Sequence, residues 1–307
     1  MVSHAKRFAI VCALIAVLGA GAGAPVTASS PQPAAPTTTL VIDHNSTDIS
    51  QVPAGWIEQA RDQFRLSYGH TSHGSQLVSG MWVLRDVNTL YNYNQDGSLQ
   101  AETLSLHDSY PPGDLGNPDR VTWAQLTRDY LNSGTPPGNN RNMVMWSWCG
   151  QADTPDPADI DLYLNLMNQL ETDYPNVQFI YMTGHLVGSG PTGNLYLRNN
   201  QIRDYARTNG KILFDFADIE SYDPDGNYYP DGSDACEWCT AWCADPAHQA
   251  ECDLAATMGD CQHSHPFNCY RKGQAVWWML ARLAGWPGPG LTPHLYFPVS
   301  LFNPQTR

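Results

Sequence analysis

The sequence has few basic residues and, after its first 28 residues, no long apolar run. It contains 16 Lys and Arg residues against 30 Asp and Glu residues, which gives a formal net charge of −14. An acidic surface repels nucleic acids and anionic membranes, so neither is expected as a partner. No later segment is long and apolar enough to span a bilayer. The sequence also has no internal repeat.

The first residues have the pattern of a secretory signal. Lys6 and Arg7 precede an apolar run over 8–24, and the small residues of 26–28 fit a cleavage site after Ala28. Removal of residues 1–28 would change the formal net charge from −14 to −16. Residues 29–40, rich in Pro, Ala and Thr, are predicted to be a flexible leader. We therefore expect a secreted or periplasmic protein without a membrane anchor.

The remaining chain, roughly 270 residues, is long enough for one large α/β domain. Helical and strand patterns alternate along it, which is typical of a mostly parallel sheet covered on both faces. We predict a three-layer α/β sandwich over 41–290 and a C-terminal tail over 291–307. The expected helices cover 159–172, 195–207 and 268–283, and the expected strands include 143–148, 177–182 and 211–216.

A segment over 222–263, rich in Asp, Gly, Pro and Cys, interrupts this alternation and is predicted to be an insertion. Six cysteines gather there and at the start of the last helix: Cys236, Cys239, Cys243, Cys252, Cys261 and Cys269. In an exported protein they are expected to form three disulfides, and the sequence leaves their pairing open. A zinc site built on Cys236, Cys239, Cys243 and a His is the alternative. Cys149 is left over and is expected to be a buried thiol.

The stretch 64–81 (FRLSYGHTSHGSQLVSGM) predicts a strand that turns directly into a helix. Such a turn exposes a serine hydroxyl, and the N–H groups at the helix start can bind a developing oxyanion. Ser72 in the turn is the candidate nucleophile, and Ser75 suits a helix N-cap. The alternative is that these are ordinary polar turn residues.

Two further motifs are expected at the edge of the sheet, where the active sites of parallel sheets lie. Gln151 follows the expected strand over 143–148, where its amide could donate to an oxyanion. Before the last helix, Asp260 stands three residues ahead of His263, a spacing at which the Asp can orient the His as a general base. His265, followed by Pro266, competes for the same role, and one of the two histidines is expected to cap or pack instead.

The order of these motifs resembles that of the SGNH (GDSL-type) hydrolases, whose motifs are Gly-Asp-Ser, Gly-x-Asn-Asp and Asp-x-x-His. A closer likeness is to SGNH-like bacterial proteins with a His-Gln-Ser-Val-Gly motif, matched by the residues from His70 to Gly74. The resemblance covers about residues 60–285. It departs from the family pattern at His-Thr-Ser in place of Gly-Asp-Ser, at Gln151 in place of Asn, and at the second oxyanion glycine, for which Gly113 and Gly116 are candidates.

The resemblance implies a serine esterase that forms an acyl-enzyme on Ser72, with His263 as base and Asp260 as orienting acid. The Ser72 N–H, a glycine N–H near Gly113 and the Gln151 side chain would form the oxyanion hole. The expected substrate is an O-acyl ester, with an O-acetylated polysaccharide as the example, and no cofactor is required. His70, His73 and His185 are candidates to line the pocket.

Two other functions are alternatives to this one. One is a catalytically silent SGNH-like module that binds glycans. The other is a metal-dependent hydrolase that uses His263, His265 and a nearby Asp or Cys.

The sequence also contains a candidate calcium-binding loop. Oxygen ligands recur at loop positions 1, 3, 5, 9 and 12. A plain turn rich in Asp, Gly and Pro explains the same residues, and its glycine does not stand where a calcium loop requires it. The candidate ligands are Asp223, Asp225, Asn227, Asp231 and Asp234.

Overall fold

The computed structural model describes residues 39–290 of the chain. The predicted signal, most of the leader and the C-terminal tail lie outside the described residues. A seven-stranded sheet forms the centre, with all neighbouring strands parallel. In spatial order its strands are β1 (Leu40–Ile42), β7 (Ile212–Phe214), β6 (Gln178–Met182), β5 (Met143–Trp146), β2 (Arg65–Gly69), β4 (Leu104–Asp108) and β3 (Tyr93–Asn94).

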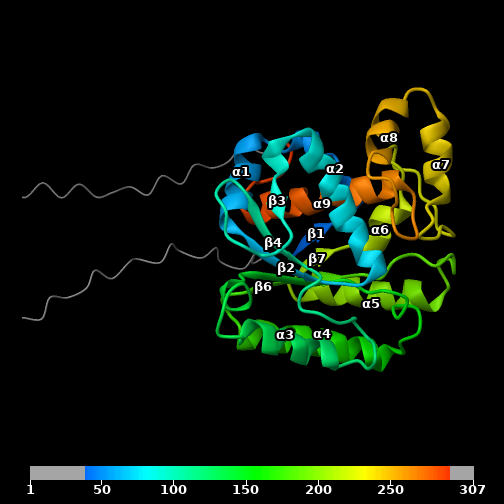
Figure 1. Cartoon of the computed structure of the whole chain (residues 1–307). Coiled ribbons are helices and arrows are strands. Elements are labelled where there is room, and N and C mark those ends of the chain that lie inside the picture. The colour runs from blue at the N-terminus through cyan, green and yellow to red at the C-terminus, as the bar shows by residue number, and fades with distance from the viewer. Residues whose placement is uncertain (1–38, 291–307) are drawn as a thin grey trace, which may run out of the picture. The chain divides into compact units, whose positions relative to one another are not determined.

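Helices cover both faces of this sheet (Figure 1). One face carries α1 (Ala54–Gln63), α2 (Ser75–Val87) and α9 (Pro266–Leu283), and the other carries α3 (Thr122–Leu131), α4 (Pro157–Asp173) and α5 (Asn194–Thr208). Two apolar clusters fill the spaces between the sheet and these helices. The predicted three-layer α/β fold is therefore confirmed, and it is consistent with the SGNH-like fold that the resemblance implies.

The burial of the strands explains why the sequence pattern identified them. All four residues of β5 and all five of β6 are buried, since helices cover both of their faces. Two strands end earlier than expected: the strand predicted over 143–148 ends at Trp146, and the strand predicted over 211–216 ends at Phe214. Asp215 there caps a short helix, α6 (Phe216–Ser221), by accepting a hydrogen bond from the Asp218 N–H.

Helices α2 and α9 pack backbone to backbone, because both carry glycine where they cross. A Cβ added to Gly80 would lie 1.9 Å from the carbonyl oxygen of Cys269, and one added to Gly273 would lie 2.2 Å from the carbonyl carbon of Gly80. This contact fixes the start of α2, and with it the turn that carries Ser72, against the last helix.

The predicted insertion contains α7 (Glu237–Ala244) and α8 (Gln249–Ala256), and the six late cysteines form three disulfides. The pairs are Cys236–Cys239, Cys243–Cys252 and Cys261–Cys269. The disulfide prediction is thus confirmed, and such bonds are typical of proteins in oxidising compartments. Within residues 39–290, no helix has the length and apolar character needed to cross a membrane.

Candidate active site at the carboxyl edge of the sheet

The candidate site begins where β2 ends. After Gly69 the chain turns through His70 and Thr71 into a short 3-10 helix, Ser72–Gly74, and then into α2. This turn is tight: a Cβ on Gly69 would lie 2.5 Å from the Trp146 ring, and one on Gly74 would lie 2.2 Å from the Ser147 Oγ. Glycine at both positions lets the turn lie directly against the end of β5. Because β5 is the neighbour of β2 in the sheet, Cys149, shortly after the end of β5, lies against the turn that carries Ser72.

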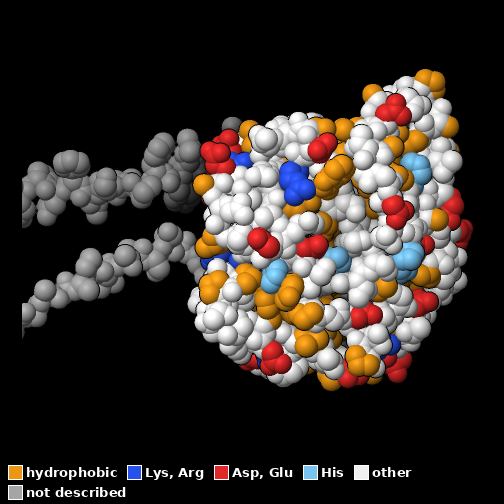
Figure 2. Space-filling model, viewed as in Figure 1, with side chains coloured by type: hydrophobic (Ala, Val, Ile, Leu, Met, Phe, Trp, Pro, Cys, Tyr) orange, Lys and Arg blue, Asp and Glu red, His pale blue; other side chains and the backbone are white. Residues whose placement is uncertain are grey.

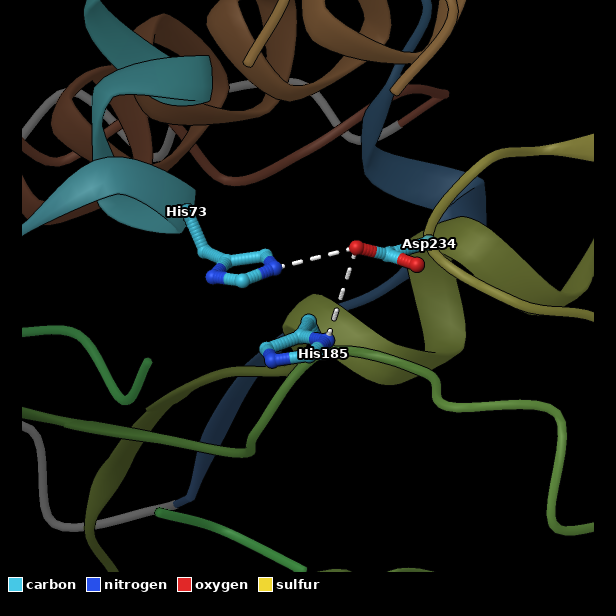
Figure 3. Close-up of side chains that lie close together, drawn as sticks. All are labelled: His73, His185 and Asp234. Atoms are coloured by element: carbon cyan, nitrogen blue, oxygen red, sulfur yellow. Dashed lines mark hydrogen bonds and ion pairs between the residues drawn. The ribbon is translucent and has the colours of Figure 1, made fainter. Parts of the chain in front are cut away.

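A chain of hydrogen bonds joins Cys149, His73 and Asp234. The Cys149 Sγ lies 3.1 Å from the His73 Nδ1, and the His73 Nε2 lies 3.0 Å from the Asp234 Oδ2. Figure 3 shows the His73 ring turned toward the Asp234 carboxylate. A thiol, an imidazole and a carboxylate in this order form the arrangement that activates a nucleophile in covalent catalysis.

The electrostatics of this chain favour a charged sulfur and a charged ring. Burial raises the pKa of the Cys149 thiol, but hydrogen bonds from Ser72, Thr71 and His73 outweigh it and bring the pKa down to about 7. Burial lowers the pKa of the His73 imidazole, while its hydrogen bonds with Asp234 and Cys149 more than offset this and raise it. Both shifts favour the charged forms, a thiolate beside an imidazolium, and the thiolate is the nucleophilic form.

Two more histidine rings stack on His73. The His185 ring, from the loop after β6, lies 3.6 Å from the His73 ring with an interplanar angle of 3°, and the His263 ring lies 4.4 Å away at 22°. His70, the other predicted pocket histidine, is held apart from this stack by Asp108 at the end of β4, with the His70 Nε2 2.7 Å from its Oδ1. Three loops thus meet at His73.

The structure also groups residues that could hold a metal ion. In the described part of the chain, ligand atoms lie within 4.8 Å of one another in His73, His185 and Asp234, and likewise in Asp43, His44 and Asp218. An imidazole lone pair lies in the plane of its ring. Because the rings of His73 and His185 are nearly parallel and stacked, their lone pairs do not converge on one ion. In this arrangement His73, His185 and Asp234 form hydrogen bonds and ring contacts with one another and are not oriented around a metal ion.

Ser72, Gln151 and the loop of Gly113 lie at the same edge of the sheet. The Ser72 Oγ is 3.5 Å from the Cys149 Sγ, and in the described residues no histidine nitrogen forms a hydrogen bond with it. The Gln151 Nε2 donates to the Asp114 Oδ2 at 2.7 Å, next to Gly113. Both loop glycines have positive φ, +135° at Gly113 and +86° at Gly116. Ser72 therefore lies at the predicted edge, but the histidine nearest to it by hydrogen bonding, His73, contacts Cys149 and not the serine.

In the described part of the chain, Asp260, the predicted orienting acid, forms no hydrogen bond with either candidate base, His263 or His265. Asp260 is exposed and accepts from the Gln262 Nε2 at 3.0 Å, and no hydrogen bond joins it to His263 within residues 39–290. The His265 Nδ1 accepts from the Phe267 N–H at 3.2 Å and so caps α9. His265 therefore has the capping role, while His263 contacts His73.

The calcium candidates do not form a ligand shell. Asp223 accepts from the backbone and side chain of Asn227 and from the Tyr229 hydroxyl, as expected of a turn. Asp234 turns instead toward His73. None of the metal groupings in the described residues combines Asp223, Asp225 and Asp231.

A buried ion pair ties the loops of the site together. The Lys272 Nζ lies 2.6 Å from the Glu220 Oε1 and also bonds to Gln76 in α2. The Glu220 Oε2 accepts from the Leu186 N–H at 2.7 Å, next to His185. The Gln76 Nε2 in turn donates to the Gln262 carbonyl at 2.6 Å, next to His263. One network therefore holds the loops that bear all three stacked histidines.

The residues that sequence reasoning underrated are Cys149, His73 and Asp234. An unpaired cysteine directly after a strand, in an otherwise oxidised set, is a signal that could have marked Cys149. His73 was considered only as a lining residue and Asp234 only as a calcium ligand. Their pairing spans 161 positions of the sequence, and no local pattern indicates it.

Comparisons of the chain with models of protein families, with curated proteins and with solved structures found no match to any of the three.

Proposed function

We propose that the chain is an exported carboxylic ester hydrolase that forms an acyl-enzyme on Cys149. The observation that carries this proposal is the hydrogen-bonded chain from the Cys149 Sγ through His73 to Asp234. Each member has the chemistry that its position requires: a thiol with a pKa of about 7, an imidazole beside it and a carboxylate behind the ring. Export is supported by the predicted signal over 1–28 and by the three disulfides.

The reaction follows from these groups. The thiolate attacks the carbonyl carbon of the ester, a C–S bond forms, and the carbonyl π electrons move to oxygen. When the intermediate collapses, the C–O bond breaks and the leaving alkoxide takes the proton held by His73. His73 then takes a proton from water, which attacks the thioester, and the C–S bond breaks to return the thiolate and release the acid. Asp234 orients the ring and stabilises its charge throughout.

The developing oxyanion needs donors at the same edge. The Gln151 amide, the N–H of Ser72 and an N–H near Gly113 are the candidates that the resemblance implies. The Ser72 side chain contacts Cys149, and Gln151, two residues after Cys149, donates to Asp114, the residue after Gly113. Preorganised donors of this kind are worth about 10²–10³ in rate each.

The resemblance to SGNH hydrolases supports esters as the substrate class and keeps Ser72 as the second candidate nucleophile. Ser72 starts a helix whose first N–H groups could bind an oxyanion, but its Oγ neighbours a sulfur rather than a base. A silent module of the same fold would have neither nucleophile active.

The proposal is tested by turnover of p-nitrophenyl acetate in six proteins: wild type, Cys149→Ala, Ser72→Ala, His73→Gln, Asp234→Asn and Asp173→Asn. We expect Cys149→Ala to abolish turnover and His73→Gln to lower it by about 10²–10⁴-fold. Ser72→Ala should keep most of it. Asp173→Asn, which changes a surface carboxylate paired with Arg128, is the matched control for Asp234→Asn.

Three results would contradict the proposal. Loss of activity in Ser72→Ala with retention in Cys149→Ala would assign the reaction to the serine. Inactive wild type would leave the silent module. Loss of activity on treatment with a chelator, restored by a divalent metal, would identify a metal-dependent hydrolase.

A further inference from the structure

A cavity of about 190 Å³ adjoins the catalytic edge. Its walls come from α5, from α6 and from two loop segments, 186–190 and 228–232. The lining combines tyrosine rings with amide and guanidinium groups, including Tyr196, Tyr222, Tyr228, Asn200 and Arg203.

The two loop segments join this cavity to the catalytic residues. Asp234 donates its backbone N–H to the Leu186 carbonyl at 3.1 Å, and Gly188 donates to the Gly232 carbonyl at 3.1 Å. His185 and Asp234 therefore stand at one end of a short antiparallel pairing, and the cavity lies along the rest of it. The lining of the cavity therefore begins at Leu186, the residue after His185.

Stacked rings form one wall of the cavity. The Tyr222 ring lies 3.9 Å from the His44 ring on one side and 4.8 Å from the Tyr228 ring, with interplanar angles of 17° and 28°. His44 is itself held by Asp218, 2.5 Å from its Nδ1. Tyr228 is 45% exposed, so the ring at the end of this stack is open to solvent. The stack is thus a preorganised aromatic platform.

A second hollow, of about 390 Å³, shares Tyr228, Pro230 and Gly232 with the first. Its wall includes Tyr229 and Trp238, whose rings lie 5.8 Å apart at 19°. The segment 228–232 is therefore a ridge with an aromatic hollow on each side. This arrangement suits a chain of repeating units rather than a single small molecule.

The charges of the first cavity favour a neutral ligand rich in hydroxyl groups. The Arg203 guanidinium is already bound by Asp215, with contacts of 2.6 and 2.7 Å, and also donates to Asn200. Arg207 also lines the cavity, and its Nη1 lies 3.8 Å from the Asp204 Oδ1. A polyanion is disfavoured by the net charge of −14, and acidic side chains are spread over the face that Figure 2 shows. Aromatic faces with amide and hydroxyl partners match the apolar faces and hydroxyl groups of sugar rings.

We propose that the two hollows on either side of the segment 228–232 bind an oligosaccharide, which makes a glycan ester the substrate. This inference rests on the proposed esterase function for the chemistry, but the binding itself does not require Cys149. Tyr228 is the aromatic residue among those that line both hollows, and it is expected to carry the largest share of the stacking contact.

The test is calorimetric titration of the wild-type chain with unmodified trisaccharides of glucose, xylose and N-acetylglucosamine. We expect saturable binding of at least one of them and an affinity about 3- to 10-fold lower in Tyr228→Ala, since an aromatic contact is worth about 0.5–1.5 kcal/mol. Tyr174→Ala, at the turn before β6 and outside both hollows, is the matched control and should bind as the wild type.

No binding of any of the three trisaccharides, or equal binding by the wild type and Tyr228→Ala, would overturn the proposal. The two proposals fail separately. If sugar binding is absent while p-nitrophenyl acetate is still hydrolysed in a manner that depends on Cys149, the esterase stands and the glycan site does not. If sugars bind but no ester is hydrolysed, the glycan site stands without the catalysis.

Discussion

The Lys272 ammonium lies 2.6 Å from the Glu220 carboxylate, and neither side chain is exposed to solvent. Burial lowers the pKa of Lys272, and the charge of Glu220 opposes that shift. This pair bonds to Gln76 and to the Leu186 N–H, so it joins α9 to α2 and to the loop that follows His185. The loops of the candidate site are therefore held by the interior of the protein as well as by their pairing with one another.

Breaking this pair should destabilise the fold strongly. Lys272→Met leaves the Glu220 charge buried without its partner, which typically costs about 3–5 kcal/mol of unfolding free energy. The measurement is urea denaturation followed by tryptophan fluorescence. Arg128→Met is the control, because Arg128 pairs with Asp173 at the surface, where the side chains are 24% and 36% exposed. That change should cost at most about 1 kcal/mol. Equal losses for the two variants would contradict the role assigned to the buried pair.

The crossing of α2 and α9 allows a prediction about glycine. Gly80→Ala would push a Cβ to 1.9 Å from a backbone oxygen of α9, so we expect a loss of at least about 3 kcal/mol, at the upper end for overpacked cores. Gly55→Ala in α1 is the matched control, since nothing lies within 4 Å of an added Cβ. It should stabilise the protein by about 0.4–1 kcal/mol. The measurement is thermal unfolding of both variants. A Gly80→Ala protein as stable as the wild type would show that α2 and α9 do not meet in this way.

The cysteine pairing predicts a thiol count. Unfolded without reductant, the chain after removal of residues 1–28 should react with one equivalent of thiol reagent, from Cys149. With reductant it should react at all seven remaining cysteines. More than one equivalent without reductant would mean that a disulfide of the insertion is absent.

The pKa of the Cys149 thiol, about 7, predicts the pH dependence of its alkylation. Because the thiolate reacts and the thiol does not, the rate with iodoacetamide should rise with pH below about 7 and level off above it. His73→Gln removes one of the hydrogen bonds that lower this pKa, so the rise should move to higher pH. A wild-type rate that keeps rising up to the range of ordinary thiols would contradict the thiolate–imidazolium pair.

Much of the fold was predictable because periodic burial leaves a local trace in the sequence. The turn at Ser72 and the position of Gln151 followed from strands that end at the same sheet edge, and neighbouring β2 and β5 confirm this placement. The end of the strand near Phe216 was missed because Asp215 caps a helix there, which competes with the apolar pattern.

The candidate site was less predictable than the fold. Asp234 reaches His73 only because the insertion folds back over the sheet edge, and Asp260 lies closer in sequence to a histidine without bonding to it. His265 resembles a catalytic histidine by its position before the last helix, yet the same position makes it a helix cap. Spacing along the chain does not show which carboxylate bonds to which histidine, because those contacts depend on loops that pair with one another over long sequence distances.

We expect Cys149, with His73 hydrogen-bonded to its sulfur, to become acylated during turnover. The most direct measurement is peptide mapping by mass spectrometry after brief exposure of the protein to p-nitrophenyl acetate and quenching in acid. We expect one acetyl group on the peptide that contains Cys149, absent in Cys149→Ala and unchanged in Ser72→Ala. An acetyl group on Ser72, with Cys149 unmodified, would contradict this expectation.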